Sequence, residues 1–372
     1  MKLAAALLLL ASMLVPATTD ISLHAACAVT PSAAHCLAKF RSVKGFAPDG
    51  YGPADLRDAY KVPATGGAGK TIAIVDAYDN PDAEADLAVY RQQFGLPDCT
   101  TANGCFRKLN QDGEADQPPI ASPNWGVEIS LDVDAASAAC PACDILLVEA
   151  DDDSLDNLGL AVDQAVKSGA TVVSNSYGAQ EFSGMETVGA HWTHPGVPIL
   201  AASGDEGFQP ALFPAVLDKV IAVGGTSLSR AANNRGWSET AWWDAGSSCS
   251  ALVPKPAWQH DTNCAMRTVA DISAVADPDT GLAVYDTFDP GVPPGWLLVG
   301  GTSAAAPFVA GLIALAGDAA DVDAPSLYAH SGDLFDVVGG STGDCGGDYL
   351  CTGVTGYDAP TGLGSPDGIA AF

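Results

Sequence analysis

The sequence predicts an α/β protein in which one parallel sheet is covered by helices on both faces. Short, continuous apolar runs alternate with longer segments of helical spacing, which is the pattern of strands that are buried on both sides. No internal repeat or low-complexity linker interrupts the chain after residue 50, so a single domain is expected there. The 372 residues, of which 48% are hydrophobic, are enough to form a large core.

The individual elements can be placed in order along the chain. Strands are expected at residues 71–78, 144–150, 170–178, 197–205 and 220–227, where apolar residues follow one another without a break. Helices are expected at 80–95, from about 125, at 154–169 and at 302–317, where the apolar residues have helical spacing. The segment that ends near residue 120 is rich in Cys, Gly and Asp and is expected to be a loop.

The N-terminus has the features of a secretory signal. One Lys precedes an apolar run from Leu3 to Val15, and small residues follow it. Residues 1–19 are therefore expected to be a signal peptide, 20–50 a short leader, and 51–372 the main domain. Cys27 could suggest a lipoprotein, but His24 stands where such a signal needs a small or aliphatic residue. The mature protein is expected to be secreted, with no membrane association.

Ten cysteines in an exported chain are expected to form disulfides. They fall into neighbouring pairs, and sequential pairing is the favoured connectivity: Cys27/Cys36, Cys99/Cys105, Cys140/Cys143, Cys249/Cys264 and Cys345/Cys351. The sequence CPAC at 140–143 could be a redox motif, but a local disulfide before a strand is the favoured interpretation.

The charge of the chain argues against nucleic acid as a partner. Sixteen basic and 45 acidic residues give a formal net charge of -29 and a pI near 4.1, whereas phosphate binding needs clustered Lys and Arg. Carboxylates lose their charge when they are protonated, so the repulsion between acidic surface residues decreases as the pH falls. The composition is therefore compatible with a protein that functions in acid.

Several polar residues are expected near the carboxyl ends of the strands, where α/β sheets place their chemistry. They are Asp76, Asp205 and Ser303, the last at the start of a helix after two glycines. In WGVEISLDVDAA, Glu128 and Asp132 are one helical turn apart and share a face. Alone, this pair would be interpreted as a solvated acidic face, and Ser303 equally well as a helix N-cap.

The motif GTSAAAP at 301–307 resembles the G-T-S-x-x-x-P of subtilisins and of sedolisins, the serine-carboxyl peptidases. Subtilisins also need a His on a helix after the first strand, and none of the six histidines lies there. Sedolisins use E-x-x-L-D on that helix and an S-G-D-x-G turn, which EISLD at 128–132 and SGDEG at 203–207 match. The segments YGPADLRDAY, NSYG, FPA, AVGGTS and GYDAPTGLGSP extend the resemblance over residues 50–372.

The resemblance implies a subtilisin-like fold and an endopeptidase that acts on proteins or peptides in acid. Ser303 would be the nucleophile, Glu128 the general base, Asp132 its orienting partner and Asp205 the donor to the oxyanion. Chemistry supports this assignment, because a His base would be protonated in acid, whereas a Glu with a pKa of about 4.3 is poised at about pH 3 to 5. Asp205 could donate only as the neutral acid.

The resemblance also implies one structural calcium ion. Its ligands would be the carboxylates of Asp336 and Asp358 and the carbonyls of Val337, Val354 and Gly356. Val354 replaces the glycine that is usual in the family. The alternative is a Gly-rich surface loop without an ion.

Other functions stay open at this stage. Sedolisins generally have a folded prodomain of well over a hundred residues, whereas about 30 residues separate the expected signal peptide from the main domain here. Either this leader is vestigial, or the enzyme folds and is restrained by other means. An inactive, peptidase-like binding protein is one alternative. A tripeptidyl-peptidase is another, and a neutral subtilisin-type enzyme built on Asp76 is a third. A monomer is expected.

Overall fold

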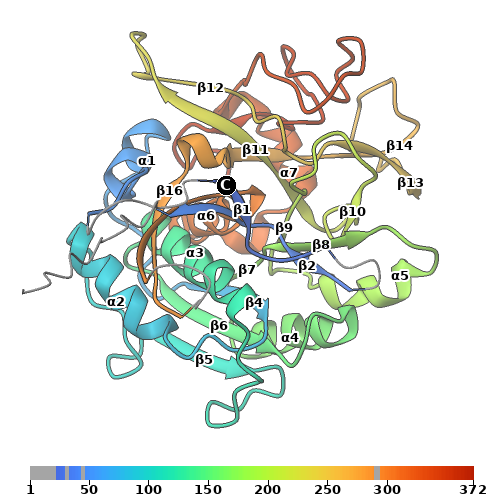
Figure 1. Ribbon diagram of the computed structural model, residues 1–372. Helices are drawn as coiled ribbons and strands as arrows, with labels where there is room; N and C mark the ends of the chain where they lie inside the picture. Colours follow the sequence, from blue (N-terminus) through green and yellow to red (C-terminus); the bar gives the residue numbers. More distant parts are fainter. Residues whose placement is uncertain (1–21, 30–32, 43–46, 289–293) are drawn as a thin grey trace, which may run out of the picture.

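The computed structural model describes residues 22–29, 33–42, 47–288 and 294–372. The expected signal peptide, 1–19, lies outside these residues. The described part of the chain forms a central sheet with helices packed on it, and smaller sheets surround its edges (Figure 1). The expected α/β architecture with a single subtilisin-like domain is confirmed.

The central sheet has eight strands, in the order β12-β11-β9-β7-β4-β6-β5, with β15 also paired to β11. All neighbours are parallel except β11 and β12, which are antiparallel. The strands are β4 (Thr71–Ala77), β5 (Phe106–Asn110), β6 (Asp144–Ala150), β7 (Val172–Asn175), β9 (Ile199–Ala202), β11 (Ile221–Arg230), β12 (Trp237–Ala241) and β15 (Ile272–Val275).

Strand β5 is a correction to the expectation of a loop up to residue 120. Its sequence, FRKLN, has neither an apolar run nor apolar and polar residues in strict alternation. The strand forms at the edge of the sheet, where β6 pairs with it on one side, so its middle residues stay partly exposed. An edge strand needs less apolar sequence than a central one, which explains why the pattern missed it.

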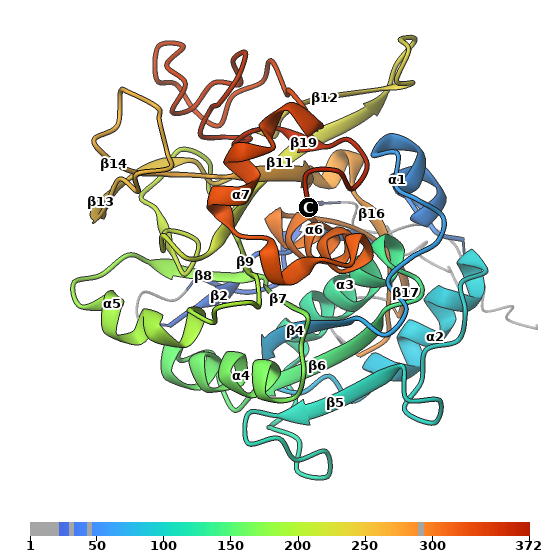
Figure 2. The same ribbon diagram turned by 180° about the vertical axis from the view of Figure 1, so that it is seen from behind.

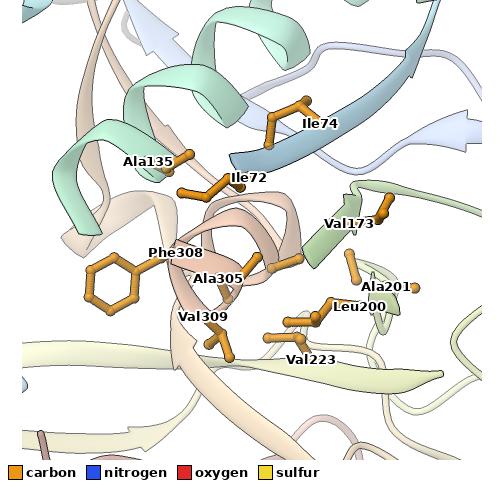
Figure 3. Close-up of a cluster of buried hydrophobic side chains, with 14 of the residues drawn as sticks. Ile72, Ile74, Ala135, Val173, Leu200, Ala201, Val223, Ala305, Phe308 and Val309 are labelled. Atoms are coloured by element: carbon orange, nitrogen blue, oxygen red, sulfur yellow. The ribbon is translucent and has the colours of Figure 1, made fainter. Parts of the chain in front are cut away.

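Helices cover both faces of the sheet. On one face α3 and α6 pack against each other and against the central strands, and α4 packs on β4 and β6 from the other (Figure 2). Figure 3 shows Ile72 of β4 between Ala135 of α3 and the residues Ala305, Phe308 and Val309 of α6. The α-helices of the described residues are α1 (Pro53–Ala59), α2 (Ala83–Phe94), α3 (Pro123–Ala139), α4 (Leu155–Lys167), α5 (Met185–Val188), α6 (Thr302–Ala316) and α7 (Ala324–Ala329).

The described residues of the segment expected to be a leader, 22–29, 33–42 and 47–50, are built into the fold. The three short strands of this segment are β1 (His24–Ala25), β2 (His35–Cys36) and β3 (Lys39–Ser42). Strands β1 and β3 lie in one sheet with β17 (Gly295–Gly300) and β16 (Leu282–Asp286). Strand β2 pairs with one edge of β8 (Tyr177–Gln180), and β10 (Leu212–Phe213) pairs with the other edge of β8. In Figure 1 this blue segment crosses the centre of the molecule, between the green and the orange elements.

Two further small sheets and five disulfides complete the fold. The sheets pair β13 (Ser248–Pro254) with β14 (Met266–Val269), and β18 (Leu334–Phe335) with β19 (Ser365–Pro366). The ten cysteines are joined in the sequential pairs that the sequence favours, so CPAC closes on itself as a local disulfide. None of the helices in the described residues is long and apolar enough to cross a membrane.

Candidate active site

Ser303 is the second residue of α6. The helix begins directly after the turn made by Gly300 and Gly301. Gly301 has a φ of 108°, in the region that favours glycine. A Cβ at this position would lie 2.0 Å from the carbonyl oxygen of Leu37, so the close approach also requires glycine. The glycines therefore allow another chain segment to pass against the helix N-terminus, where the dipole favours developing negative charge.

Pro307 explains the spacing of the S-x-x-x-P motif. Proline has no N–H, so the helical hydrogen bond to the carbonyl four residues earlier, that of Ser303, is missing. The hydroxyl of Ser176 donates to this carbonyl at 3.5 Å, and the hydroxyl of Ser303 donates to the carbonyl of Ser176 at 3.2 Å. Ser176, which directly follows β7, thus donates one hydrogen bond to Ser303 at the start of α6 and accepts another from it.

Glu128 and Asp132 lie on the face of α3 that packs toward α6, and both are fully buried. Burial raises the pKa of each carboxyl well above its ordinary value, and the charge of Asp76 raises both further. The Ser303 hydroxyl and the Ala38 N–H face Glu128 and lower its pKa, although neither meets full hydrogen-bond geometry. The alternative of a solvated acidic face is excluded.

One sequence expectation is corrected here. Glu128 does not keep the ordinary pKa that the argument for a base at about pH 3 to 5 assumed. Asp76, at the end of β4, belongs to the same buried carboxyl cluster as Glu128 and Asp132, which brings the carboxylate of the alternative subtilisin-type mechanism into the same site. Burial raises the pKa of Asp76 to about 7. Carboxyls this close titrate as a group and hold their protons more strongly than isolated ones.

Asp205 follows β9 and faces the start of α6. Its Oδ1 accepts hydrogen bonds from both the N–H and the hydroxyl of Thr302, each at 2.8 Å. Its Oδ2 has no hydrogen-bond partner among the described residues and lies against Gly301. Burial raises the pKa of Asp205 to about 7, although the charge of Lys39 and the two Thr302 bonds lower it. Below that pH, Oδ2 can carry a proton and donate it.

The structure brings Glu128, Asp132, Asp205 and Ser303 together around one point, as the motifs implied. The sequence does not indicate that Ser176, within the matching segment NSYG, hydrogen-bonds with Ser303. It also gives no indication of the backbone at Leu37 and Ala38, because no motif in the leader indicates that it reaches the site. These contacts are between residues far apart in the sequence, and only the folded chain reveals them.

The loop expected to hold calcium brings its five residues close together. Gly356 N–H donates to both carboxylate oxygens of Asp336 at 3.1 Å, and Val354 N–H donates to Asp358 at 2.8 Å. Burial, together with the charge of Asp336, raises the pKa of Asp358 to about 7. Val337, next to Asp336, is buried. Two neighbouring carboxylates that repel each other fit a hard cation, and the backbone contacts to them here come from N–H groups.

The described residues contain no group of three or more His, Cys, Asp or Glu side chains that could hold a metal ion. The calcium set does not depend on such a group, because only Asp336 and Asp358 would contribute side chains. Backbone carbonyls would have to supply the remaining protein ligands.

Comparison with known proteins agrees with this geometry. The model of the subtilase family matches residues 132–326, which include Ser303 and Asp205. The chain belongs to the subtilase family. Kumamolisin of Bacillus sp. (strain MN-32) is 31% identical to this subtilase over 363 residues, which are 87% of the chain and 63% of kumamolisin. Sedolisin of Pseudomonas sp. (strain 101) is 28% identical over 357 residues, 84% of the chain and 58% of that protein.

The resemblance to sedolisins is therefore confirmed within the subtilase family. The solved structure of Pseudomonas sedolisin in complex with pseudo-iodotyrostatin has the same fold, with a TM-score of 0.73 and 24% identity. It is matched over 86% of this subtilase and 96% of the sedolisin chain. The subtilase spans about 60% of the length of the two curated relatives.

Proposed function

We propose that this subtilase is a secreted, acid-acting serine-carboxyl endopeptidase that hydrolyses protein or peptide bonds through an acyl-enzyme. The observation that carries the proposal is the arrangement around Ser303: a hydroxyl at a helix N-terminus, a buried carboxyl facing it, and a second carboxyl with one free oxygen beside it. These are a nucleophile, a base and a potential donor to an oxyanion.

In the proposed reaction, Ser303 Oγ attacks the substrate carbonyl while Glu128 accepts its proton. Asp132 lies one turn further along α3 and shares that proton with Glu128, so the two carboxyls act as a pair. Asp205, protonated at Oδ2, donates to the oxyanion that develops. Glu128 then returns the proton to the leaving amine, and water releases the acyl group by the same steps in reverse order.

The pKa shifts define a pH window for this mechanism. Asp205 has a pKa of about 7 and loses its donor function as the pH rises through that value. The carboxyl cluster must instead lose one proton before Glu128 can act as a base, which sets the acidic side. Activity should therefore be confined to acidic and weakly acidic pH.

Calcium would stabilise the C-terminal loop in this proposal. Asp336 and Asp358 would hold the ion with their carboxylates, and Val337, Val354 and Gly356 with their carbonyls. The ion would supply charge neutralisation between two acidic side chains and would take no part in hydrolysis. Secretion is supported by the disulfides that join all ten cysteines.

The test compares wild type with Ser303→Ala in digestion of an unfolded protein from about pH 2 to about pH 8. Wild type should digest the protein in acid, and Ser303→Ala should lose nearly all activity while circular dichroism shows it folded. Release of tripeptides alone from the N-terminus would indicate a tripeptidyl-peptidase instead. No digestion by folded wild type, even after its N-terminal leader has been removed, would favour a peptidase-like binding protein.

A further inference from the structure

The helix that carries Glu128 and Asp132 also carries a buried carboxyl on its opposite face. Asp134 of α3 is 1% exposed and, two residues beyond Asp132, it faces α2 and β16 instead of α6. None of the proposed catalytic steps uses this carboxyl. Its burial therefore needs another explanation, because a buried polar group is costly unless its surroundings satisfy it.

Asp134 lies where three elements meet. Helix α3 packs on α2 and on β16, and α2 also packs on β16 (Figure 1). The Oδ2 of Asp134 accepts a hydrogen bond from the backbone N–H of Tyr285 in β16 at 3.2 Å. Four charged or titratable side chains of the described residues face it, which are Asp86, Tyr90 and Arg91 of α2 and Asp286 of β16. This place is called the α2–α3–β16 junction below.

Little in the junction satisfies a charged Asp134. Its Oδ1 is buried and has no hydrogen-bond partner among the described residues. The guanidinium of Arg91 donates elsewhere, to the Ser137 hydroxyl at 2.9 Å and to the carbonyls of Pro97 and Pro141 at 2.5 and 2.6 Å. A buried carboxylate without a hydrogen-bonded cation is costly, so the neutral acid is the form of Asp134 that suits this place.

The junction also borders an apolar cluster. The rings of Tyr90 and Tyr285 pack on Trp296 of β17, with ring centres 6.2 and 5.2 Å apart. Tyr285 donates its N–H to Asp134, and Tyr90 faces the same carboxyl, so these rings separate it from water. An apolar border of this kind cannot stabilise a charge on Asp134.

Burial raises the pKa of Asp134 well above its ordinary value, and the charges of Asp86 and Asp286 raise it further. The Tyr285 N–H and the charge of Arg91 offset only part of this effect. Burial also raises the pKa of Asp86, to about 6. Asp134 is therefore uncharged in acid, and ionisation at higher pH places like charges on both sides of the junction.

Hydrogen bonds connect the junction to the catalytic turn of α3. Ser130 lies one turn before Asp134 and between Glu128 and Asp132 in the sequence. Its hydroxyl donates to Oδ1 of Asp286 at 3.0 Å, which joins α3 to β16. Asn80 Nδ2 donates to the Ser130 hydroxyl and to the Gly126 carbonyl, each at 3.2 Å. A movement of β16 against α3 is thus transmitted to the turn that carries the catalytic carboxyls.

We propose that Asp134 is a pH-dependent positioning residue. As the neutral acid it lets α2, α3 and β16 pack together, whereas as the carboxylate it repels the acidic groups of α2 and β16 and loosens the junction. Movement of α3 displaces Glu128 and Asp132. Movement of β16 displaces its partner β17, which leads directly into the turn before Ser303. The enzyme would then lose its active-site geometry in a neutral medium, independently of the protonation of Asp205.

The direction of the pKa shift gives the sign of the effect. The folded pKa of Asp134 lies above the unfolded value of about 3.9, so its stabilisation is fully present below about pH 4. It is lost as the pH rises through the folded pKa. Loss of the Asp205 proton would lower catalysis, but ionisation of Asp134 would also lower the melting temperature, which separates the two effects.

The experiment measures melting temperatures by circular dichroism from about pH 3.5 to about pH 7.5, in a Ser303→Ala background that lacks the proposed nucleophile. Asp134→Asn keeps an acceptor for Tyr285 and cannot ionise. It should melt about 3 °C or more above its parent at the neutral end and show no such gain at the acidic end. Asp116→Asn, at an exposed carboxyl, makes the same change in net charge and should follow its parent at every pH.

Asp86→Asn is a second variant, which decides the test if Asp134→Asn does not fold. It removes one of the repelling carboxyls and should shift the profile in the same direction by a smaller amount. The double variant should gain less than the sum of the single ones, because each substitution removes repulsion that the other also removes.

An activity measurement completes the test. Wild type held at about pH 7.5 and returned to acid should lose activity about threefold faster than Asp134→Asn, which has the same Ser303. Melting profiles of Asp134→Asn and Asp86→Asn that run parallel to the parent's would overturn this inference and leave the proposed function intact. Inactive wild type with the expected melting profiles would overturn the proposed function and leave this inference intact.

Discussion

The backbone N–H and the hydroxyl of Thr302 both donate to Oδ1 of Asp205, each at 2.8 Å. These two bonds fix the orientation of the carboxyl, because they leave Oδ2 as the oxygen that faces Gly301 and the Leu37 carbonyl. Thr302 immediately precedes Ser303, so the first residue of α6 positions the donor and the second supplies the nucleophile. Two consecutive residues of the G-T-S sequence therefore contribute to the site: Thr302 orients the Asp205 carboxyl, and Ser303 is the proposed nucleophile.

The first prediction follows from this orientation. The pKa of Asp205 is raised to about 7, so its donor function is present below that pH and is lost as the pH rises through it. Asp205→Asn keeps an oxygen for Thr302 and places an N–H at the position of Oδ2 at every pH. The alkaline limb of kcat/KM should move upward, while peak activity falls by up to about a hundredfold because the amide is imperfectly placed.

Asp244→Asn is the control for that profile. The charge of Asp244 raises the pKa of Asp205, so removing it should move the alkaline limb slightly downward, in the opposite direction. Both profiles are measured on a peptide substrate at pH values where circular dichroism shows folded protein. If Asp205→Asn merely scales the profile down, with both limbs in place, Asp205 does not set the alkaline limb.

The second prediction separates the carboxyl mechanism from a subtilisin-type one. Asp76 raises the pKa of both Glu128 and Asp132, so Asp76→Asn removes a like charge from the cluster. Its activity should persist, and the acidic limb of kcat/KM should move to lower pH. Glu128→Gln should instead abolish activity at all pH values, since no base remains. Loss of activity in Asp76→Asn and its persistence in Glu128→Gln would identify Asp76 as the essential carboxylate.

The sequence predicted the central strands and the site residues well because both have strong local signals. Buried parallel strands such as β4 and β6 are uninterrupted apolar runs, and EISLD, SGDEG and GTSAAAP place Glu128, Asp205 and Ser303 by short motifs. Strand β5 was not predicted, because an edge strand needs no apolar run. The raised pKa of Glu128 could not be predicted from the sequence, because it depends on burial and on Asp76, which lies 52 positions earlier in the chain.

The third prediction concerns calcium. Asp336→Ala, or a chelator added to wild type, should lower the melting temperature. An ion present at a hundredfold excess over its Kd stabilises the folded state by about 2.7 kcal/mol, or on the order of 5 °C. Asp344→Ala, at an exposed loop residue, is the control and should keep the chelator effect. Identical melting curves of wild type with and without chelator would remove calcium from the account of this loop.

The last prediction concerns His35, which lies in β2 two residues before Leu37. The residue is 7% exposed, and neither ring nitrogen has a hydrogen-bond partner among the described residues. Burial lowers its pKa below 6.5, and the charges of Glu206 and Asp153 offset only part of that effect. Docking of the leader is therefore favoured above the ordinary pKa of histidine and loses this contribution as the pH falls through the lowered pKa.

Acid should thus loosen the leader. In a Ser303→Ala background, which lacks the proposed nucleophile, hydrogen exchange of the amides of residues 34–40 should lose protection on acidification, after correction for the intrinsic rate. The additional variant His35→Gln cannot acquire the charge, so it should retain protection to lower pH, whereas His330→Gln, at an exposed histidine, should behave as its parent. If the pH dependence is the same in both variants, His35 does not sense acid.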